Sequence, residues 1–350
     1  MKPLLLRQAL SLLTLGFLTL GSIACFASTP PKESFSQWLI GFKQQALKAG
    51  VSKSTLDKEL LGLSYNKKIV SLDRKQPEKT VTFQQYIKRR VSPRVVETGE
   101  KYIQENRNAL LKVSRHYQVE PEIIAAIWGA ESNYGTYPMK HDVIQALATL
   151  SYDNRRRNYF TKELIAALKI LEAKHIDRAS FKGSWAGALG QTQFMPSNYL
   201  RLAQDFDKDG RKDIWHTPED VFASIAFYLK KHGWQAEQPW ALQVTVPENF
   251  NRNKSVHLKN PKASPRALRS HSEPFKPSYW KAQGIVDIDS TLVSRTELPT
   301  SLYIPADSKN MGFLTFPNYR SILRYNPSNY YALSVSLLAD KLQPYTRPIQ

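Results

Sequence analysis

The stretch Gly129-Ala-Glu-Ser-Asn-Tyr-Gly135 places an acidic residue directly after the nearly all-apolar run PEIIAAIWGA, which begins at Pro121. Pro121 suits the first turn of a helix, and the isoleucines and tryptophan of the run cover nearly its whole circumference, so we expect a helix buried on most sides. Glu131 would then lie at the C-terminal end, where burial and the helix dipole both disfavour a charged carboxylate. The stretch therefore predicts a glutamate with a raised pKa that can act as a general acid.

Two features of this stretch leave alternatives open. Gly129 and Gly135 would let backbone and a bulky ligand approach closely, which favours a binding site. Glu131 could instead pair with an arginine at a helix end, because ion-pair networks perturb pKa values too.

A second stretch, SWAGALGQTQFMPSNY, runs from Ser184 to Tyr199 and combines glycines with small and amide side chains. Such a loop can approach a ligand, and Ser184, Gln193 and Ser197 offer the neutral hydrogen bonds that sugars need. The alternative is an ordinary tight loop, since glycine clusters often mark turns.

The chain has 350 residues, of which 42% are hydrophobic, enough to bury a core in about two domains. Its first residues carry Lys2 and Arg7 ahead of an apolar run and small residues, a pattern that predicts a secretory signal peptide over residues 1–27. The run is short for a membrane anchor. Cleavage after Ala27 would give a soluble periplasmic protein, whereas lipid attachment at Cys25 would give an outer-membrane lipoprotein.

Cysteine usage and charge narrow the function further. Cys25 is the single cysteine, which excludes a disulfide framework, and thiol catalysis in the mature chain. Without the two basic residues of the signal peptide, 47 basic against 30 acidic residues leave a net charge of +17. This charge favours a polyanionic partner, or simply solubility. Lys and Arg are spread without a basic helix or zinc-finger spacing, so a cell-wall polymer fits an exported protein better than nucleic acid.

The spacing of apolar residues along the chain predicts an α+β fold that is mainly α. Apolar spacings of three and four indicate a helical body over residues 28–240. The alternating LQVTV that follows, the Pro-, Ser- and Lys-rich stretch 251–278 and later strand-like runs predict a small β-containing subdomain over 241–318. Over 319–350, Tyr331, Val335, Leu338 and Leu342 share one helical face, so we expect a C-terminal helix that packs back on the body.

The segment from Asp205 to Asp213, DFDKDGRKD, has acidic residues at positions one, three, five and nine and glycine at six, as in an EF-hand calcium loop. Position twelve is His216, so a longer loop would have to supply the bidentate carboxylate, with Asp220, or Glu219, as the candidate. The alternatives are a solvated Asp-Gly turn and a helix capping box from Thr217 to Asp220. The predicted ligands of a structural calcium ion are Asp205, Asp207, Asp209, Arg211 and Asp220.

Five motifs in order, ESNYG, SWAGALGQTQFMPSNY, DFDKDGRKDIW, FYLKKHGW and RYNPSNYYALSVSLLADKL, resemble those of the lytic murein transglycosylases of the B family, glycoside hydrolase family 103. The resemblance spans roughly residues 83–342. It implies a lysozyme-like catalytic core with a helical domain and a small β-containing subdomain. It also implies cleavage of the β-1,4 bond between N-acetylmuramic acid and N-acetylglucosamine without water, which leaves a 1,6-anhydromuramoyl end.

The resemblance further implies that Glu131 is the only catalytic carboxylate, acting first as acid and then as base, unlike the two-carboxylate glycosidases. Asp142 and Asp153 are the weaker candidates for a second carboxylate. The implied substrate-binding residues are Ser184, Gln193, Tyr228, Tyr325, Asn326 and Tyr331, with Arg155 and Arg156 for the acidic muramic acid or peptide groups. Arg157 leaves the register of that arginine pair open by one, and for each aromatic ring core packing is the alternative.

Other functions receive less support. The sequence has no HExxH motif, phosphate loop or dinucleotide fingerprint. A hydrolytic muramidase would use the same cleft and acid but admit water, and a non-catalytic wall-binding protein would keep the cleft without turnover. We expect a monomer with no cofactor for catalysis and with peptidoglycan glycan strands as its partner; cell-wall synthesis enzymes are further candidate partners.

Overall fold

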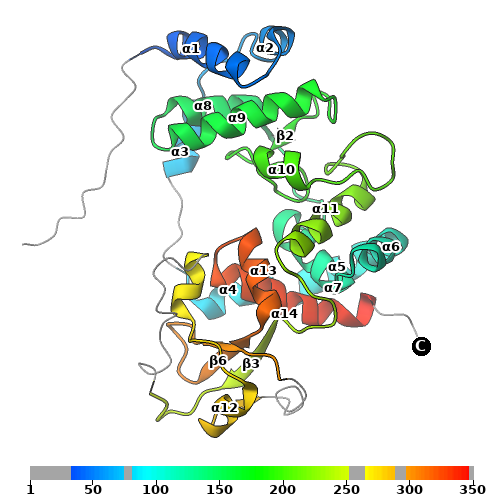
Figure 1. Ribbon diagram of the computed structural model, residues 1–350, viewed down its shortest axis with the longest axis vertical. Coiled ribbons are helices and arrows are strands. Elements are labelled where there is room, and N and C mark those ends of the chain that lie inside the picture. Colours follow the sequence, from blue (N-terminus) through cyan, green and yellow to red (C-terminus); the bar gives the residue numbers. More distant parts are fainter. Residues whose placement is uncertain (1–32, 75–80, 252–264, 288–296, 347–350) are drawn as a thin grey trace, which may run out of the picture.

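The computed structural model describes residues 33–74, 81–251, 265–287 and 297–346. The predicted signal peptide, with Cys25, lies outside the described residues. The chain is mainly helical, with a small antiparallel sheet at one end (Figure 1). Across the described ranges, no helix is both long and apolar enough to span a membrane.

One helical lobe, at the top of Figure 1, is built around the buried helix α8. Its elements are α1 (Phe35–Lys48), α2 (Lys53–Glu59), α3 (Lys67–Arg74), α8 (Val143–Tyr152), α9 (Arg157–Glu172) and α10 (Pro196–Leu202). The side chain of Asp142 begins α8 by accepting the backbone N–H of Gln145 at 2.8 Å. Eight of the ten residues of α8 are buried, because α3 and α9 cover it. This lobe also holds a two-stranded ribbon, β1 (His141–Asp142) with β2 (Lys182–Gly183).

The middle of the molecule is organised around α7, which begins at Pro121 and ends at Ser132. Every residue from 122 to 129 is buried, so the helix is enclosed on most sides, as its sequence predicts. The helices α5 (Pro93–Glu105), α6 (Arg107–Tyr117) and α11 (Pro218–Lys231) pack against it. The core around α7 therefore fixes the position of Glu131 within the fold.

The sheet lies at the bottom of Figure 1 and has the order β4-β3-β6-β5, with all neighbours antiparallel. Its strands are β3 (Ala241–Thr245), β4 (Val286–Asp287), β5 (Ser301–Tyr303) and β6 (Met311–Thr315). The short helices η2 (Arg266–Ser270) and α12 (Pro277–Ala282) accompany it, and α4 (Phe83–Arg90) lies nearby. Trp280 and apolar strand residues such as Val244 and Leu314 form a separate small core.

The C-terminal part consists of two helices, α13 (Pro317–Tyr325) and α14 (Asn329–Thr346), rather than the single helix expected over 319–350. Tyr331, Val335, Leu338 and Leu342 are at most 3% exposed, because α14 packs along α7. The ribbon β1–β2 was also not expected, since two-residue strands are too short to show an alternating pattern.

Candidate active site

The ESNYG stretch ends α7 directly after Glu131. Asn133, Tyr134 and Gly135 all have left-handed backbone, with φ of 49°, 58° and 78°. The hydroxyl of Ser132 donates to the carbonyl of Trp128 and accepts the N–H of Gly135, both at 3.0 Å. This tight turn closes the helix and holds Glu131 on its last turn.

The glycines of this stretch make room for protein side chains rather than for a ligand. A Cβ atom on Gly129 would lie 2.5 Å from the ring of Tyr134, which is buried against Trp128. A Cβ atom on Gly135 would lie 2.5 Å from Oε1 of Gln191. The structure thus gives both glycines a packing role that differs from the predicted one.

Glu131 is half-buried and has one direct hydrogen-bond partner among the described residues. The hydroxyl of Tyr331, from α14, donates to its Oε1 at 2.6 Å. Burial raises the pKa of Glu131 to about 7, although the hydrogen bond from Tyr331 and the charge of Arg90 both lower it. The predicted rise in pKa is confirmed. A carboxyl with this pKa can release and accept a proton near neutral pH.

Arg90, at the end of α4, supplies the positive charge near Glu131, and sequence reasoning missed it. Its Nη1 donates to the carbonyl of Ala130 at 3.2 Å, and its guanidinium lies 5.7 Å from the ring centre of Tyr86. In the sequence Arg90 ends the run Lys-Arg-Arg, which looks like an ordinary solvated helix end. Only the packing of α4 near the end of α7 turns it toward the carboxylate.

Tyr325 and Tyr228 form an aromatic pair beside Glu131. The ring centres are 4.7 Å apart, and the hydroxyl of Tyr325 donates to the carbonyl of Thr192 at 2.7 Å. Burial, followed by the negative charge of Glu131, raises the pKa of Tyr325 well above its usual value. Tyr228 is 5% exposed and donates its hydroxyl to the carbonyl of Arg324 at 2.5 Å, so it supports Tyr325 from behind.

The loop that follows Ser184 is held by hydrogen bonds from its own side chains. Ser184 Oγ accepts the N–H of Ala188 at 3.0 Å. Gln193 has left-handed backbone (φ 52°), and its Nε2 donates to the carbonyl of Gly190 at 2.9 Å. Asn326 is the C-cap residue of α13 and directly follows Tyr325. These predicted sugar-binding groups lie on segments that the protein itself keeps in place.

Gln191, which sequence reasoning passed over, ties this loop to α7. Its Oε1 accepts the indole N–H of Trp128 at 2.6 Å, while its Nε2 donates to the carbonyl of Trp215 at 2.7 Å. Two glutamines two residues apart in GQTQ look equivalent in the sequence. Their different hydrogen bonds show that Gln191 is structural and leave Gln193 as the candidate for substrate contact.

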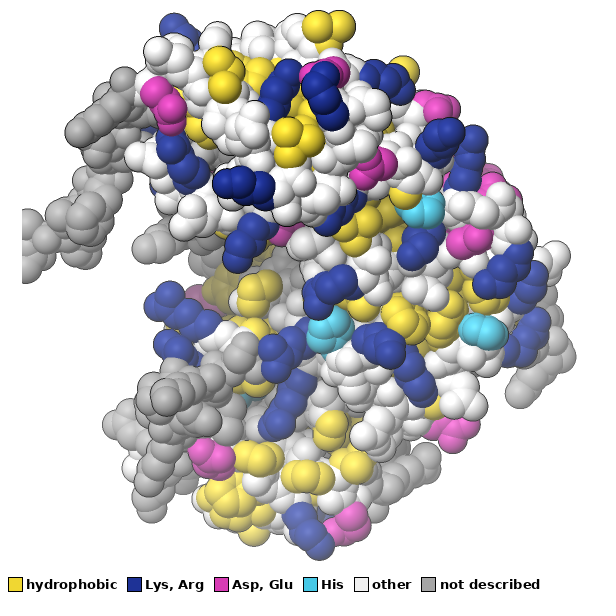
Figure 2. All heavy atoms as spheres, turned by 45° about the horizontal axis from the view of Figure 1, so that its top comes forward, with side chains coloured by type: hydrophobic (Ala, Val, Ile, Leu, Met, Phe, Trp, Pro, Cys, Tyr) yellow, Lys and Arg dark blue, Asp and Glu magenta, His cyan; other side chains and the backbone are white. Residues whose placement is uncertain are grey.

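These contacts bring four separate segments together around Glu131. Trp128 joins α7 to the loop, Tyr325 joins α13 to the loop, and Tyr331 joins α14 to Glu131. Figure 2 shows that the molecule is hollowed between its upper and lower lobes, with Lys and Arg side chains along the rim. Such a surface suits a large, negatively charged substrate.

Arg155 and Arg156 have a different environment from the one expected. Nε of Arg155 donates to Oδ2 of Asp73 at 2.8 Å, and Nη2 of Arg156 lies 3.1 Å from Oδ1 of the same carboxylate, which is 2% exposed. Both arginines thus tie α3 to the start of α9. Their predicted contact with acidic substrate groups stays a prediction.

The two alternative carboxylates are each paired with an arginine. Both carboxylate oxygens of Asp142 accept from Arg178, and these bonds lower the pKa of Asp142 despite its burial. Asp153 forms an ion pair with Arg74 at 3.1 Å. Asp142 is thus held at both oxygens, whereas Oδ2 of Asp153 is buried without a hydrogen-bond partner among the described residues and burial raises the pKa of Asp153.

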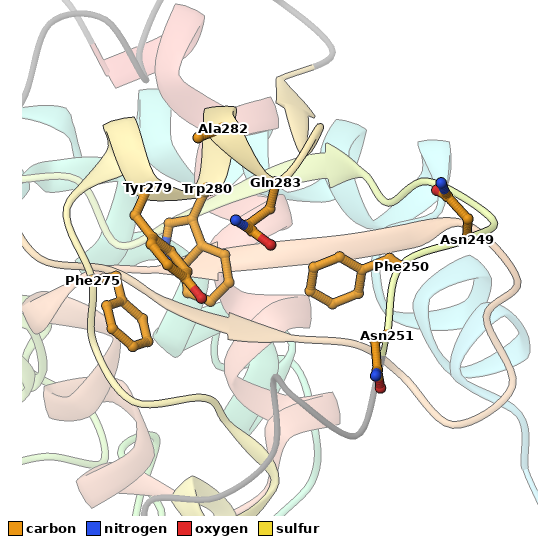
Figure 3. Close-up of a pocket in the computed structure, with 8 residues that line it drawn as sticks. All are labelled: Asn249, Phe250, Asn251, Phe275, Tyr279, Trp280, Ala282 and Gln283. Carbon is orange, nitrogen blue, oxygen red and sulfur yellow. The ribbon is translucent and has the colours of Figure 1, made fainter.

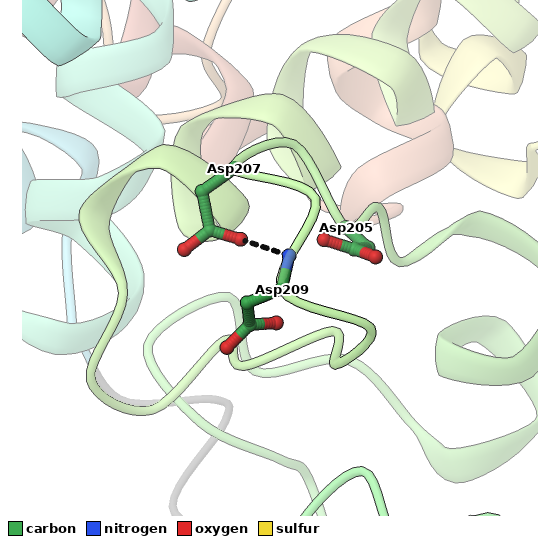
Figure 4. A group of neighbouring side chains, drawn as sticks. All are labelled: Asp205, Asp207 and Asp209. Carbon is green, nitrogen blue, oxygen red and sulfur yellow. Dashed lines mark hydrogen bonds between the residues drawn. The ribbon is translucent and has the colours of Figure 1, made fainter.

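The acidic loop after α10 gathers Asp205, Asp207 and Asp209, each with a carboxylate oxygen within 4.8 Å of the others (Figure 4). The N–H of Asp209 donates to Asp207, and that of Gly210, with φ of 90°, donates to Oδ2 of Asp205. The other oxygen of Asp205 is buried and has no hydrogen-bond partner within the described chain. This donor set fits a hard cation such as Ca²⁺.

Asp220 joins both ends of this loop. It is 1% exposed, and its two oxygens accept the backbone N–H groups of Phe206 and Asp213 at 2.6 and 2.7 Å. Burial raises its pKa to about 6, although these two hydrogen bonds lower it. The predicted capping box is wrong, because the side chain of Thr217 makes no capping hydrogen bond at the start of α11. The backbone N–H of Arg211 donates to Oδ1 of Asp209 at 2.7 Å, so Arg211 lies beside the three clustered carboxylates.

A lysozyme-like fold with one half-buried glutamate of raised pKa defines a class of enzymes that cut cell-wall glycans. Residues 34–340 match the family model of the transglycosylase SLT domain, and the chain belongs to that family. It is 29% identical over 314 residues to membrane-bound lytic murein transglycosylase B of Escherichia coli (strain K12), a match that covers 89% of this chain and 82% of that protein.

Solved structures agree with this assignment. SltB3 from Pseudomonas aeruginosa in complex with NAG-NAM-pentapeptide is 36% identical, with a TM-score of 0.81 over 91% of this chain and 82% of that one. The Escherichia coli lytic transglycosylase Slt35 in complex with bulgecin A is 27% identical, with a TM-score of 0.72 over 90% of this chain and 94% of that one. The chain is a lytic murein transglycosylase with the lysozyme-like fold of these enzymes.

Proposed function

We propose that Glu131 is the single general acid and base of this transglycosylase. Its pKa of about 7 and its hydrogen bond from Tyr331 carry the proposal, since a carboxyl poised near neutral pH serves both roles. As acid, Glu131 gives its proton to the oxygen that links N-acetylmuramic acid to N-acetylglucosamine, and the bond from C1 to that oxygen breaks. As base, it takes the proton of the muramoyl 6-hydroxyl while O6 bonds to C1. The product is a 1,6-anhydro ring, no water is consumed, and Glu131 ends protonated as it began.

The surroundings of Glu131 stabilise both its protonated and its charged form. Tyr331 and Arg90 stabilise the carboxylate formed after the first step, while burial favours the protonated acid needed before it. Both oxygens of Asp142 are held by Arg178, which supports a mechanism with one carboxylate. The N-acetyl group of the substrate then takes the place of a nucleophilic carboxylate at the oxocarbenium-like centre.

The substrate would be held by neutral groups from the surrounding segments. Ser184, Gln193 and Asn326 supply hydroxyl and amide groups for sugar hydroxyl and acetamido groups, and Tyr325 supplies a ring face. Tyr228 acts through Tyr325, and Tyr331 acts through Glu131. Peptidoglycan fragments bound to SltB3 support a glycan strand as the substrate here. Arg155 and Arg156, which also pair with Asp73, are the residues proposed for its acidic groups.

Mass spectrometry of muropeptides released from purified peptidoglycan tests the reaction. The mature protein should release anhydromuramoyl products, and Glu131→Gln, which keeps the shape of the side chain but cannot give up a proton, should not. Reducing ends that carry added water would instead identify a muramidase. Release of equal amounts by both forms would remove Glu131 from the mechanism.

We also propose that the loop of Asp205, Asp207 and Asp209 binds a structural Ca²⁺ ion, with the carbonyl of Arg211 as a further ligand. The orphaned oxygen of Asp205 and the close carboxylates support it, as does a calcium complex of Slt35, 27% identical with a TM-score of 0.72. Asp220, whose oxygens already accept two N–H groups, would have to share a lone pair with the ion.

We infer that the chain is exported and acts in the periplasm, in keeping with its cell-wall substrate and the signal sequence over residues 1–27. Cleavage after Ala27 gives a soluble form, and lipid attachment at Cys25 would give an anchored one. Intact mass of the mature protein distinguishes the two, because the lipidated chain begins at Cys25 and carries its acyl groups.

A further inference from the structure

A pocket of about 280 Å³ lies on the β-containing subdomain and takes no part in the site around Glu131. Four aromatic rings line it, those of Phe250, Phe275, Tyr279 and Trp280, from α12 and the segments beside it (Figure 3). Trp280 is anchored, with 2% exposure and an indole N–H that donates to the carbonyl of Thr300 at 3.1 Å. The rings therefore stand on a rigid part of the small core.

Two of these rings pack edge-on against Trp280 and are also exposed at the surface. Phe275 and Tyr279 are 39% and 40% exposed, and they stack with centres 4.2 Å apart and planes 21° from parallel. Large exposed aromatic surfaces that are held rigidly often mark binding sites. The stacked pair therefore offers a pre-formed flat surface to a ligand.

Three amide residues, Asn249, Asn251 and Gln283, line the pocket beside the hydroxyl of Tyr279. Of these, Asn249 and Gln283 have no side-chain hydrogen-bond partner within the part of the chain that the structure describes. Figure 3 shows the side chain of Gln283 between the rings of Trp280 and Phe250. An amide offers both a donor and an acceptor, which suits a ligand that carries hydroxyl and acetamido groups.

The pocket is uncharged on a strongly basic chain. None of its eight lining residues is charged, although the full sequence has a net charge of +19. Lys276, next to Phe275, is paired with Glu297 at 3.0 Å. A phosphate-rich or acidic ligand would find no counter-charge among these eight described residues. Aromatic faces with neutral amides match the apolar CH faces and polar edges of N-acetylated sugars.

We propose that this pocket binds N-acetylated sugar residues of a glycan strand at a distance from the bond that is cut, with Phe275 and Tyr279 as the stacking surface and Asn249 and Gln283 as the hydrogen-bonding groups. This inference rests on the activity of the enzyme on peptidoglycan. A second contact on the same polymer makes binding at the catalytic site effectively intramolecular, which strengthens retention on long strands without any change in chemistry.

Binding to purified sacculi tests the proposal, in a Glu131→Gln background that does not consume them. The double variant Phe275→Ala/Tyr279→Ala should bind about tenfold more weakly in co-sedimentation, whereas Tyr279→Phe, which keeps the ring, should bind like its parent. Val286→Ala is the matched control, since Val286 is 58% exposed on the neighbouring strand β4 and does not line the pocket. Sacculus binding of the double variant equal to that of its parent overturns the proposal.

Turnover separates this proposal from the assignment of the reaction. With Glu131 intact, the double variant should cut a short soluble tetrasaccharide at the parental rate and lose activity only on sacculi. A parent that does not release anhydro products from either substrate refutes the proposed reaction, not the pocket. If the parent's pocket-dependent binding disappears on peptide-stripped strands, the ligand is the stem peptide and the sugar proposal is wrong. Should the double variant unfold, Asn249→Ala/Gln283→Ala carries the same test.

Discussion

Glu131 at the end of α7 and Asp220 at the start of α11 are both carboxylates whose pKa burial raises, to about 7 and about 6. Asp220 is 1% exposed and engages both oxygens with backbone N–H groups of its loop. Glu131 accepts one hydroxyl hydrogen, from Tyr331, and keeps part of its surface open. A raised pKa is therefore common to a carboxylate that holds a loop and to one that can exchange protons. The partners of the oxygens distinguish the two roles.

The largest expected effect comes from exchanging each carboxylate for its amide. Glu131→Gln should lower the rate of anhydromuropeptide release by about 10²- to 10⁴-fold, the usual contribution of general acid–base catalysis, and leave folding intact. Asp220→Asn should destabilise the fold by about 1–3 kcal/mol, because one backbone N–H loses its acceptor, with a smaller effect on rate. Steady-state kinetics and urea unfolding of both variants measure the contrast. Equal losses of rate in both would show that the two carboxylates do not differ as described.

A second effect isolates the hydroxyl of Tyr331. Tyr331→Phe removes a hydrogen bond to the charged form of Glu131, so the pKa of Glu131 should rise further above its usual value and the rate should fall about ten- to hundredfold. Tyr330→Phe, one residue away on α14, is the matched control because Tyr330 packs against Phe83 and Tyr86 instead. The pH profile of kcat is the measurement. An unchanged profile would contradict the role of Tyr331 as a partner of Glu131.

The local part of this site could be predicted from sequence, because the causes are local. A proline start, continuous apolar residues and the position of Glu131 on the last turn were enough to predict a buried helix and a raised pKa, and both are confirmed. The four strands of the sheet left recognisable alternating or apolar runs. Tyr331 and Tyr325 were found only through the order of the family motifs.

The remaining features depend on contacts between distant segments. Arg90 acts on Glu131 from a helix 41 residues earlier in the chain, and Arg155 is held by an aspartate 82 residues earlier. In the sequence, Asp220 fits the pattern of a capping box. Its actual partners are the backbone N–H groups of Phe206 and Asp213, and backbone groups leave no mark in the sequence. Tertiary hydrogen bonds of this kind decide the role of a polar residue, and no local pattern reports them.

The pH dependence should separate the two carboxylates by the window in which each titrates. The pKa of Glu131 is raised from 4.5 to about 7, so its protonated form favours the folded state; this stability is full below pH 4.5 and is lost as pH rises to 7. The Glu131→Gln variant should therefore gain stability relative to the parent over that range, and the rate of the parent should fall about tenfold per unit well above pH 7. For Asp220 in the calcium-free protein, the pH range over which this stability is lost is 3.8 to 6. Thermal unfolding of Glu131→Gln and Asp220→Asn from pH 4 to 8, each compared with the parent, tests whether Asp220 titrates at lower pH than Glu131. Coincident windows would contradict it.

The smallest effect should come from calcium, and it concerns the loop alone. Asp205, Asp207 and Asp209 have carboxylate oxygens within 4.8 Å, so an ion that joins them relieves their mutual repulsion and stabilises the folded state. At ten times its Kd, calcium would add about 1.4 kcal/mol, which corresponds to a rise of about 2 °C in Tm for a chain of this size. Asp205→Asn should abolish the rise, whereas Asp57→Asn, an exposed aspartate paired with Lys53, should keep it. Differential scanning calorimetry with calcium and with EDTA provides the measurement. A calcium-dependent rise that persists in Asp205→Asn would place the ion elsewhere, because that carboxylate holds the one oxygen of the cluster that is buried and lacks a hydrogen-bond partner among the described residues.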